Sequence, residues 1–198
     1  MTIVAGIVLA AADALVDDVA VPLISLSADD TLLEWQVREM QRAGIDVVEV
    51  VLGCRADVLI PLVSRDDVEP VVDARWKSGP GSWLRTGASA TPRDTVAAVV
   101  LDITEPRPAA VIRRVLEARS PGVDLVCASC AGADASPWVL DALPLAVLRT
   151  MRDDAAGVAE LAARRRWRCV RVEVGDAELM RITSVEDVAR FRGRLAAS

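Results

Sequence analysis

Four residues in the middle of the chain have the types and spacing of a phosphate site. Lys77, Ser82 and Arg85 share one turn-rich stretch, and Asp102 directly follows an apolar run at residues 96–101. Cationic side chains and a hydroxyl bind phosphate oxygens, and one strand-end carboxylate can hold Mg²⁺ when substrate phosphates supply further ligands. The first three residues are therefore candidates for an anion site, and Asp102 is a candidate metal ligand. Solvated loop cations and a helix-capping carboxylate are the alternatives.

The loop after the first apolar run, residues 3–11, lacks the groups that hold a nucleotide. Phosphate loops at this position carry glycines and a lysine or arginine. From residue 10 to residue 26 the chain has no Gly, Lys or Arg, and three aspartates stand in the turn, Asp13, Asp17 and Asp18. We interpret these aspartates either as a solvated turn or as an acidic surface that docks a basic partner.

Histidine is absent from the chain. This removes the commonest general base, the commonest metal ligand and every Ser–His or Cys–His nucleophile pair. Of the cysteines, Cys127 and Cys130 have CxxC spacing, whereas Cys54 and Cys169 are isolated. Because a structural zinc site needs four ligands, we expect reduced thiols packed as small apolar groups, with zinc or a redox pair as the alternative.

Charge and hydropathy exclude several classes of partner. The formal net charge is −6, which disfavours nucleic acid, since binding to a duplex rests on phosphate neutralisation by Lys and Arg. The basic cluster at residues 164–168 is expected at a helix end. No apolar stretch reaches the roughly 18 to 20 residues of a membrane span. The first apolar run has no basic flank and no cleavage site, so we expect a cytoplasmic protein without a signal peptide.

Strand-like and helix-like segments alternate along the chain. Thr31 and Glu34, and later Ser184 and Asp187, have the spacing of helix starts. Residues 138–147 mix strand and helix signals. Strands are predicted at residues 3–11, 47–52, 71–72, 96–101, 124–129 and 169–174, and helices from residue 31 to Gly44 and at residues 56–63, 84–90, 108–118, 157–166 and 184–195.

This alternation is typical of βαβ crossovers, which place helices on both faces of a mainly parallel sheet. We predict an α/β fold with three layers, α/β/α, in a single domain that spans residues 1–198. In such sheets, ligands bind beyond the carboxyl ends of the strands. The loop at residues 12–21, the stretch at residues 76–87 and Asp102 should therefore meet at one edge.

Seven short segments, in order and over nearly the whole length, give the chain a resemblance to the MobA-like group of NTP transferases, the molybdenum-cofactor cytidylyl- and guanylyltransferases. The resemblance implies a Rossmann-like nucleotidyltransferase fold. The segments are Gly6-Ile-Val-Leu-Ala-Ala11, Leu32-Leu-Glu-Trp35, Ala43-Gly44, Val50-Val-Leu-Gly53, Trp76-Lys-Ser-Gly79 with Ser82-Trp-Leu-Arg-Thr-Gly87, Val99-Val-Leu-Asp102 and Ser184-Val-Glu-Asp-Val-Ala-Arg190.

Members of this group join a nucleotide from CTP or GTP to a phosphate-bearing acceptor, usually a pterin, and release pyrophosphate. Mg²⁺ and basic groups offset the charge at the phosphates. The resemblance therefore implies a glycine-rich loop with an arginine and a lysine, and several carboxylates for the metal.

The chain departs from the family pattern at these positions. Where relatives read L-A-A-G-x-S-x-R-M-G-x-x-K, the first glycine is Ala12, the arginine is Val16, the second glycine is Asp18 and the lysine is Val21. The G-H-P segment is Ala135-Ser136-Pro137, and the D-I-D-T segment is Arg181-Ile-Thr-Ser184. Trp83 replaces a small serine. Of the metal ligands, only Asp102 is retained.

These departures predict a MobA-like protein that has lost NTP transfer. We expect it to act as a non-catalytic binding or regulatory partner linked to maturation of the molybdenum cofactor or of molybdoenzymes, with a protein partner at the vacated active-site face and neither nucleic acid nor membrane. The alternative is a divergent transferase that passes CTP or GTP to a phosphorylated acceptor such as molybdopterin. Mg²⁺ is expected as a cofactor only if nucleotide binding is retained.

Overall fold

The structure, a computed structural model, describes residues 2–27, 30–64, 67–151 and 156–197. Its strands are β1 (Ile3–Ala10), β2 (Leu15–Val16), β3 (Val19–Ala20), β4 (Ser25–Ser27), β5 (Asp30–Thr31), β6 (Val47–Leu52), β7 (Val68–Val72), β8 (Thr95–Asp102), β9 (Leu125–Cys130), β10 (Ala133–Asp141) and β11 (Cys169–Glu173). Its α-helices are α1 (Leu32–Arg42), α2 (Ala56–Val63), α3 (Pro80–Ala90), α4 (Ala109–Glu117), α5 (Ala142–Thr150), α6 (Val158–Arg165) and α7 (Val185–Ala196), and its 3-10 turns are η1 (Val21–Leu23), η2 (Trp76–Ser78) and η3 (Asp176–Glu178).

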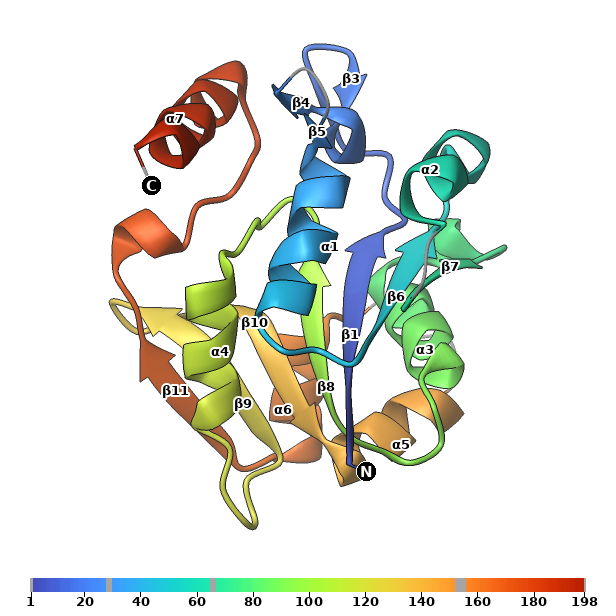
Figure 1. The fold of residues 1–198 in the computed structure, drawn as a ribbon. Helices are drawn as coiled ribbons and strands as arrows, with labels where there is room; N and C mark the ends of the chain where they lie inside the picture. Colours follow the sequence, from blue (N-terminus) through green and yellow to red (C-terminus); the bar gives the residue numbers. More distant parts are fainter. Residues whose placement is uncertain (1, 28–29, 65–66, 152–155, 198) are drawn as a thin grey trace.

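Within the described residues, one seven-stranded sheet runs in the order β11-β9-β10-β8-β1-β6-β7 (Figure 1). The pairs β1–β6, β1–β8, β6–β7 and β9–β11 are parallel, whereas β10 is antiparallel to both of its neighbours. The prediction of a mainly parallel sheet is thus confirmed. The stretch with mixed signals, residues 138–147, is the end of β10 followed by the start of α5.

Helices cover both faces of the sheet, as predicted for three α/β/α layers (Figure 1). One face packs against α1, α2, α4 and α7, and the other against α3, α5 and α6. The central strands lie between these layers, which is why β1 and β8 read as apolar runs rather than alternating ones, and why β6 does so apart from Glu49. No described helix is long and apolar enough to cross a membrane.

Local signals fixed most of the element boundaries. The Thr31 side chain accepts from the Glu34 backbone N–H at 3.3 Å, and the Ser184 hydroxyl accepts from Asp187 at 3.2 Å, so both predicted helix starts are confirmed. Helix α3 begins four residues before the predicted residue 84, because Pro80 is preorganised for the first helical turn. Strand β7 begins before residue 71, because an edge strand tolerates Pro70.

The carboxyl ends of β1, β6 and β8 form one edge of the sheet. In register, Leu9 pairs with Asp102 and Ala10 pairs with Leu52, so these three strands end side by side. The β2–β3 hairpin follows β1 at this edge, and α2 follows β6. The predicted meeting place of loop and strand-end carboxylate is therefore present in the fold.

Candidate functional site

The loop after β1 is a closed β-hairpin. Strands β2 and β3 pair antiparallel, and the two tip residues, Asp17 and Asp18, have φ angles of 50° and 61°. Positive φ at both central residues is the signature of a type I′ turn, which matches the twist of a two-residue hairpin. Below the hairpin, the Val21 N–H donates to the Ala14 carbonyl at 2.9 Å. The backbone of this loop thus bonds to itself.

The side chains of the hairpin divide into a buried and an exposed set. Val16 is 7% exposed and Val21 is 1% exposed, and both belong to the core that packs against α1. Asp17 and Asp18 are exposed at the tip. The two positions that the family resemblance assigns to a phosphate-binding arginine and lysine are therefore part of the hydrophobic core, and the solvent-facing tip carries negative charge.

Asp102 ends β8 and is held by the turn that follows. One of its carboxylate oxygens, Oδ1, accepts from the Thr104 backbone N–H at 2.8 Å and from the Thr104 hydroxyl at 2.6 Å. Burial raises the pKa of the Asp102 carboxyl above its ordinary value, and the hydrogen bonds from Thr104 oppose that rise. Asp102 is thus both half-buried and partly used in capping a turn.

Three residues after Asp102, Glu105 is the centre of a buried polar network. Its Oε2 accepts from the Ser136 hydroxyl at 2.7 Å and from Arg107 Nη2 at 3.2 Å, and its Oε1 accepts from Arg181 Nε at 3.1 Å. Burial by itself raises the pKa of Glu105, but the bonds from Ser136 and Arg181 and the charge of Arg107 hold it below its ordinary value. Glu105 is therefore a satisfied, ionised carboxylate.

Arg107 is 1% exposed, which is rare for an arginine. Its guanidinium donates to the carbonyls of Ser136 at 2.8 Å and Met180 at 2.7 Å, and its backbone is bonded in both directions by the Gln36 amide. Burial lowers the pKa of Arg107 to about 10, against the opposing charge of Glu105, so the side chain stays protonated at neutral pH.

Arg181 reaches this network from the segment that precedes α7. The Ile182 N–H donates to the Thr104 carbonyl at 2.7 Å, which fixes the segment beside the end of β8. The bond to Glu105 raises the pKa of Arg181, and the charge of Arg181 acts on Asp102 as well. A guanidinium thus lies beside both carboxylates, at a position where the family resemblance implies an acidic residue.

A cavity of about 310 Å³ opens beside these charged groups. Asp102, Glu105 and Arg181 line one part of it, and the indoles of Trp83 and Trp138 line another. The Trp83 indole N–H donates to the Trp76 carbonyl at 2.7 Å, which fixes the ring. Asp134 also lines the cavity, which therefore combines a charged wall with a rigid apolar one.

The structure does not bring the other predicted site residues to this cavity. Lys77 is exposed and lies over the Trp76 ring at 5.4 Å from its centroid. Ser82 is fully buried, and its hydroxyl has no hydrogen-bond partner among the described residues. Arg85 is half-buried on α3. None of the three lines the cavity, although Pro80, Trp83 and Leu84 from the same stretch do; their binding role stays a prediction.

The residues present do not fit a divalent cation. Mg²⁺ requires nearly octahedral oxygen ligands. Asp102 uses one oxygen on Thr104, Glu105 is saturated by Ser136 and two arginines, and the guanidinium of Arg181 lies beside both carboxylates. Across the described parts of the chain, no group of three or more His, Cys, Asp and Glu residues could hold a metal ion. The described residues thus supply no ligand set made of protein groups alone, and the metal role of Asp102 together with substrate phosphates stays a prediction.

Sequence reasoning missed Glu105 and Arg107 as parts of this site. Their only local signal is the string Glu105-Pro-Arg-Pro108 directly after the strand-end carboxylate. Four cysteine thiols are free, and Cys127 is fully buried in β9, where burial raises the pKa of its thiol to about 12. A thiolate is thus disfavoured at the first position of the CxxC pair.

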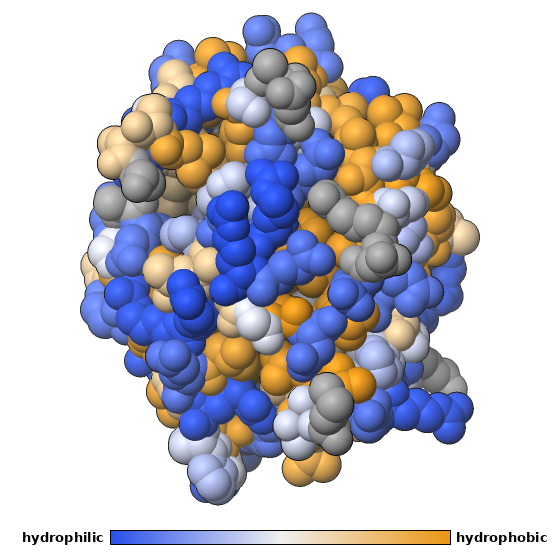
Figure 2. All heavy atoms as spheres, viewed as in Figure 1, coloured by the Kyte–Doolittle hydropathy of each residue, from blue (hydrophilic) through white to orange (hydrophobic). Residues whose placement is uncertain are grey.

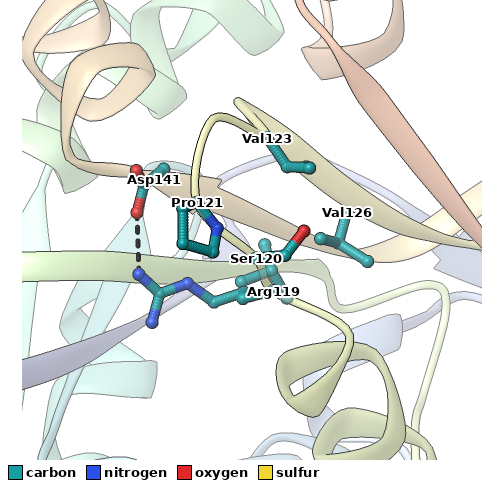
Figure 3. Close-up of a pocket in the computed structure, with 7 residues that line it drawn as sticks. Arg119, Ser120, Pro121, Val123, Val126 and Asp141 are labelled. Carbon is teal, nitrogen blue, oxygen red and sulfur yellow. Dashed lines mark hydrogen bonds and ion pairs between the residues drawn. The ribbon is translucent and has the colours of Figure 1, made fainter.

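A second hollow, of about 320 Å³, lies at the opposite end of the sheet (Figure 3). Val123, Val126 and Val139 are among the residues that line it, and the two charged residues there, Arg119 and Asp141, pair with each other at 2.7 Å. Because ligands of α/β sheets bind at the carboxyl ends of the strands, the cavity beside Asp102 is the better candidate site.

The sequence of the chain matches a known protein family over most of its length. The model of the MobA-like NTP transferase domain matches residues 7–170. The chain therefore belongs to the MobA-like NTP transferase family, which confirms the family suggested by its sequence motifs. No curated protein matches the sequence at a significant level.

Solved structures share the fold over almost the full length of the chain. Rv0371c from Mycobacterium tuberculosis is 20% identical, with a TM-score of 0.79 over 97% of this chain and 98% of that one. The nucleotidyl transferase Mth528 from Methanothermobacter is 20% identical, with a TM-score of 0.83 over 99% of each chain. A 4-diphosphocytidyl-2C-methyl-D-erythritol synthase from Anaerococcus prevotii is 13% identical, with a TM-score of 0.76 over 98% of this chain and 99% of that one.

At these identities the likeness establishes the nucleotidyltransferase fold. One of the structures is a complex of Rv0371c with manganese, at 21% identity and a TM-score of 0.77 over 97% of this chain and 98% of that one. A divalent metal is thus found with a protein of this fold. In this chain, Arg181 lies beside the carboxylates of Asp102 and Glu105.

Proposed function

We propose that this chain does not transfer nucleotides and acts in the cytoplasm as a binding or regulatory partner in the maturation of the molybdenum cofactor or of molybdoenzymes. The closed hairpin after β1 carries the proposal. Val16 and Val21 are core residues where the family pattern has a cationic pair, and the tip exposes Asp17 and Asp18. Membership of the MobA-like family supports the link to the molybdenum cofactor.

The electrostatics of the hairpin argue against a bound triphosphate. A unit-charge interaction at contact distance is worth on the order of 1 to 4 kcal/mol between bulk water and a protein surface. Replacing two cations by valines removes attraction, and two aspartates at the tip add repulsion. A triphosphate would also find few free N–H donors, because the hairpin backbone pairs with itself.

The polar network after β8 supports the same proposal. Arg107 and Arg181 supply two positive charges beside Asp102 and Glu105, so the two carboxylates are compensated without a metal ion. Glu105 is fully bonded by protein groups. Nucleotidyl transfer needs positive groups that stabilise the charge at the phosphates. Here the charged side chains are already paired with one another.

The first experiment is a thermal-shift titration with CTP, GTP, ATP and UTP, each with and without Mg²⁺. A ligand that binds the native state raises its stability by about 2.7 kcal/mol at a hundredfold excess over Kd. We expect no shift at millimolar nucleotide and no pyrophosphate release in the presence of molybdopterin. A Mg²⁺-dependent shift together with pyrophosphate release would establish the divergent transferase instead.

A second experiment tests whether Arg181 excludes the metal. Arg181→Asp should bind Mn²⁺ with a Kd of about 1 mM or below, because three carboxylates would then face one another. Electron paramagnetic resonance of free Mn²⁺ measures this directly. Arg190→Asp is the matched control, because its side chain is 61% exposed against 64% for Arg181. Equal Mn²⁺ binding by the wild-type chain and Arg181→Asp would contradict the compensating role of Arg181.

A further inference from the structure

An apolar groove of about 420 Å³ runs between the β2–β3 hairpin and α7. Val19 and Leu23 line it from the hairpin side, and Val185 and Val188 line it from α7. The groove lies at the same edge of the sheet as the closed hairpin but is lined by different residues from the cavity beside Asp102. It is thus a second concave surface at the proposed binding face.

Large apolar side chains are exposed at this groove. Val19 is 44% exposed and Val185 is 51% exposed. Figure 2 shows a run of orange, apolar residues near the top on the side of α2, whereas the surface on the side of α7 mixes hydrophilic and apolar residues. A contiguous apolar patch rimmed by charge is typical of a protein interaction site.

The rim of the groove is acidic. Asp17 and Asp18 at the hairpin tip and Glu186 in the first turn of α7 are exposed, and none of their carboxylates makes an ion pair or hydrogen bond with another described residue. The one arginine that lines the groove, Arg192, donates through Nε to the Ser25 carbonyl at 3.0 Å. The three carboxylates outnumber this one guanidinium, so the surface carries net negative charge.

We propose that this groove docks an amphipathic, basic protein segment, with apolar side chains between hairpin and α7 and Lys or Arg side chains on Asp17, Asp18 and Glu186. This inference rests on the proposed function, because it names the kind of partner that a non-catalytic binding protein would take. Acidic rims repel nucleic acid and anionic membranes. They also repel a second copy of this chain, whose net charge is −6.

The test uses a fluorescent synthetic helix of leucine and lysine, with leucines on one face, and measures its anisotropy against the full chain. We expect binding that weakens with added salt, and no binding of the equivalent leucine–glutamate helix. Asp17→Asn/Asp18→Asn should lose about tenfold in affinity at low salt, because asparagine keeps the positive φ angles and removes both charges. Val19→Ser/Val185→Ser should bind the helix about tenfold more weakly, because this variant removes apolar contacts.

Matched controls lie at the opposite end of the sheet and on α5. Asp94→Asn/Glu117→Gln removes two exposed charges there, and Leu143→Ser removes a side chain that is 75% exposed. Both should bind the leucine–lysine helix like the wild-type chain. The docking proposal would be overturned if the control variants lost as much affinity for the helix as the groove variants do, or if the wild-type chain did not bind it.

Two further results separate the proposals from each other. Light scattering that shows a dimer abolished by Val19→Ser/Val185→Ser would replace the basic segment by a second copy and overturn the inference. Pyrophosphate release would overturn the proposed function, whereas absence of peptide binding leaves that function intact and removes only the docking surface. Unchanged circular dichroism of each variant shows that the fold is retained.

Discussion

The hairpin after β1 and the polar network after β8 lie at the same edge of the sheet, yet opposite kinds of interaction stabilise them. Val16 and Val21 anchor the hairpin by apolar burial, and its charges point outward. The network instead buries its charges, because Glu105 and Arg107 satisfy each other and the carbonyls around them. Both arrangements leave a nucleotide without cationic groups that are free to bind it.

The difference between the two regions decides which changes each tolerates. A hairpin held by apolar burial accepts new charge at its tip but not at its anchors. A buried ionic network does not tolerate the loss of a buried member, because the remaining charge is left unpaired in a low dielectric. Four substitutions test this contrast, in order of decreasing effect.

The largest effect is expected for Glu105→Ala. It leaves Arg107, 1% exposed, without its carboxylate, so the free energy of unfolding should fall by about 3 to 5 kcal/mol. Urea denaturation at neutral pH measures the loss. Arg181→Ala is the control, because its side chain is 64% exposed and its ion pair should contribute about 0 to 1 kcal/mol. A smaller loss of unfolding free energy in Glu105→Ala than in Arg181→Ala would show that the network does not stabilise the fold.

In the hairpin, Val21→Lys should destabilise the chain by about 3 kcal/mol, because an ammonium would enter a core site that is 1% exposed. The matched variant Val19→Lys lies on the same hairpin at 44% exposure and should change stability by about 0.5 kcal/mol or less. Denaturant titration compares the two. Equal effects would contradict the assignment of Val21 as an anchor.

The buried carboxylate of Glu49 contrasts with that of Glu105, because no cationic side chain pairs with it among the described residues. Glu49 on β6 is 1% exposed, its Oε2 has no partner among the described residues, and it pairs in register with Glu69. Burial, with a smaller part from the charge of Glu69, raises the pKa of Glu49 from 4.5 to about 7. The folded state therefore retains a proton that the unfolded chain has released, and stability falls as pH rises from about 4.5 to about 7.

Glu49→Gln should raise Tm at pH 8, where the wild-type chain buries a charge, and have little effect at pH 5. We expect an increase of several degrees, since 1 kcal/mol corresponds to about 2 to 4 °C for a chain of this size. Differential scanning calorimetry at both pH values measures it. Glu69→Gln, at an exposed position, is the control for the neighbouring charge. An equal shift at both pH values would rule out the titration of Glu49 as its cause.

The smallest effect is expected at the hairpin tip. Asp17→Asn/Asp18→Gly supplies the sequence preferred by a type I′ turn at the two positions of positive φ. Stability should rise by about 0.5 to 1 kcal/mol, because glycine removes the strain of a side chain in this region and the two charges no longer repel each other. Thermal denaturation checks this. A decrease in Tm would show that the tip aspartates stabilise the hairpin.

Much of the fold could be predicted from local patterns. The apolar runs of β1 and β8 indicate strands covered on both faces, and the Thr31–Glu34 and Ser184–Asp187 spacings indicate helix starts. These signals are local because burial on both faces and N-terminal capping act on neighbouring residues. The antiparallel direction of β10 left no such signal, because it depends on which strands lie beside it.

By itself, the sequence determined the family, the layered fold and the absence of a phosphate-binding loop after β1. Only the tertiary structure decided that this loop is a closed hairpin and that Arg181 lies beside Asp102 and Glu105. Residues 105 and 181 are bonded across 76 positions of sequence, and such a contact exists only once the strands and α7 are packed together. Residue types record which chemical groups are available, whereas folding decides which of them meet and which neutralise one another.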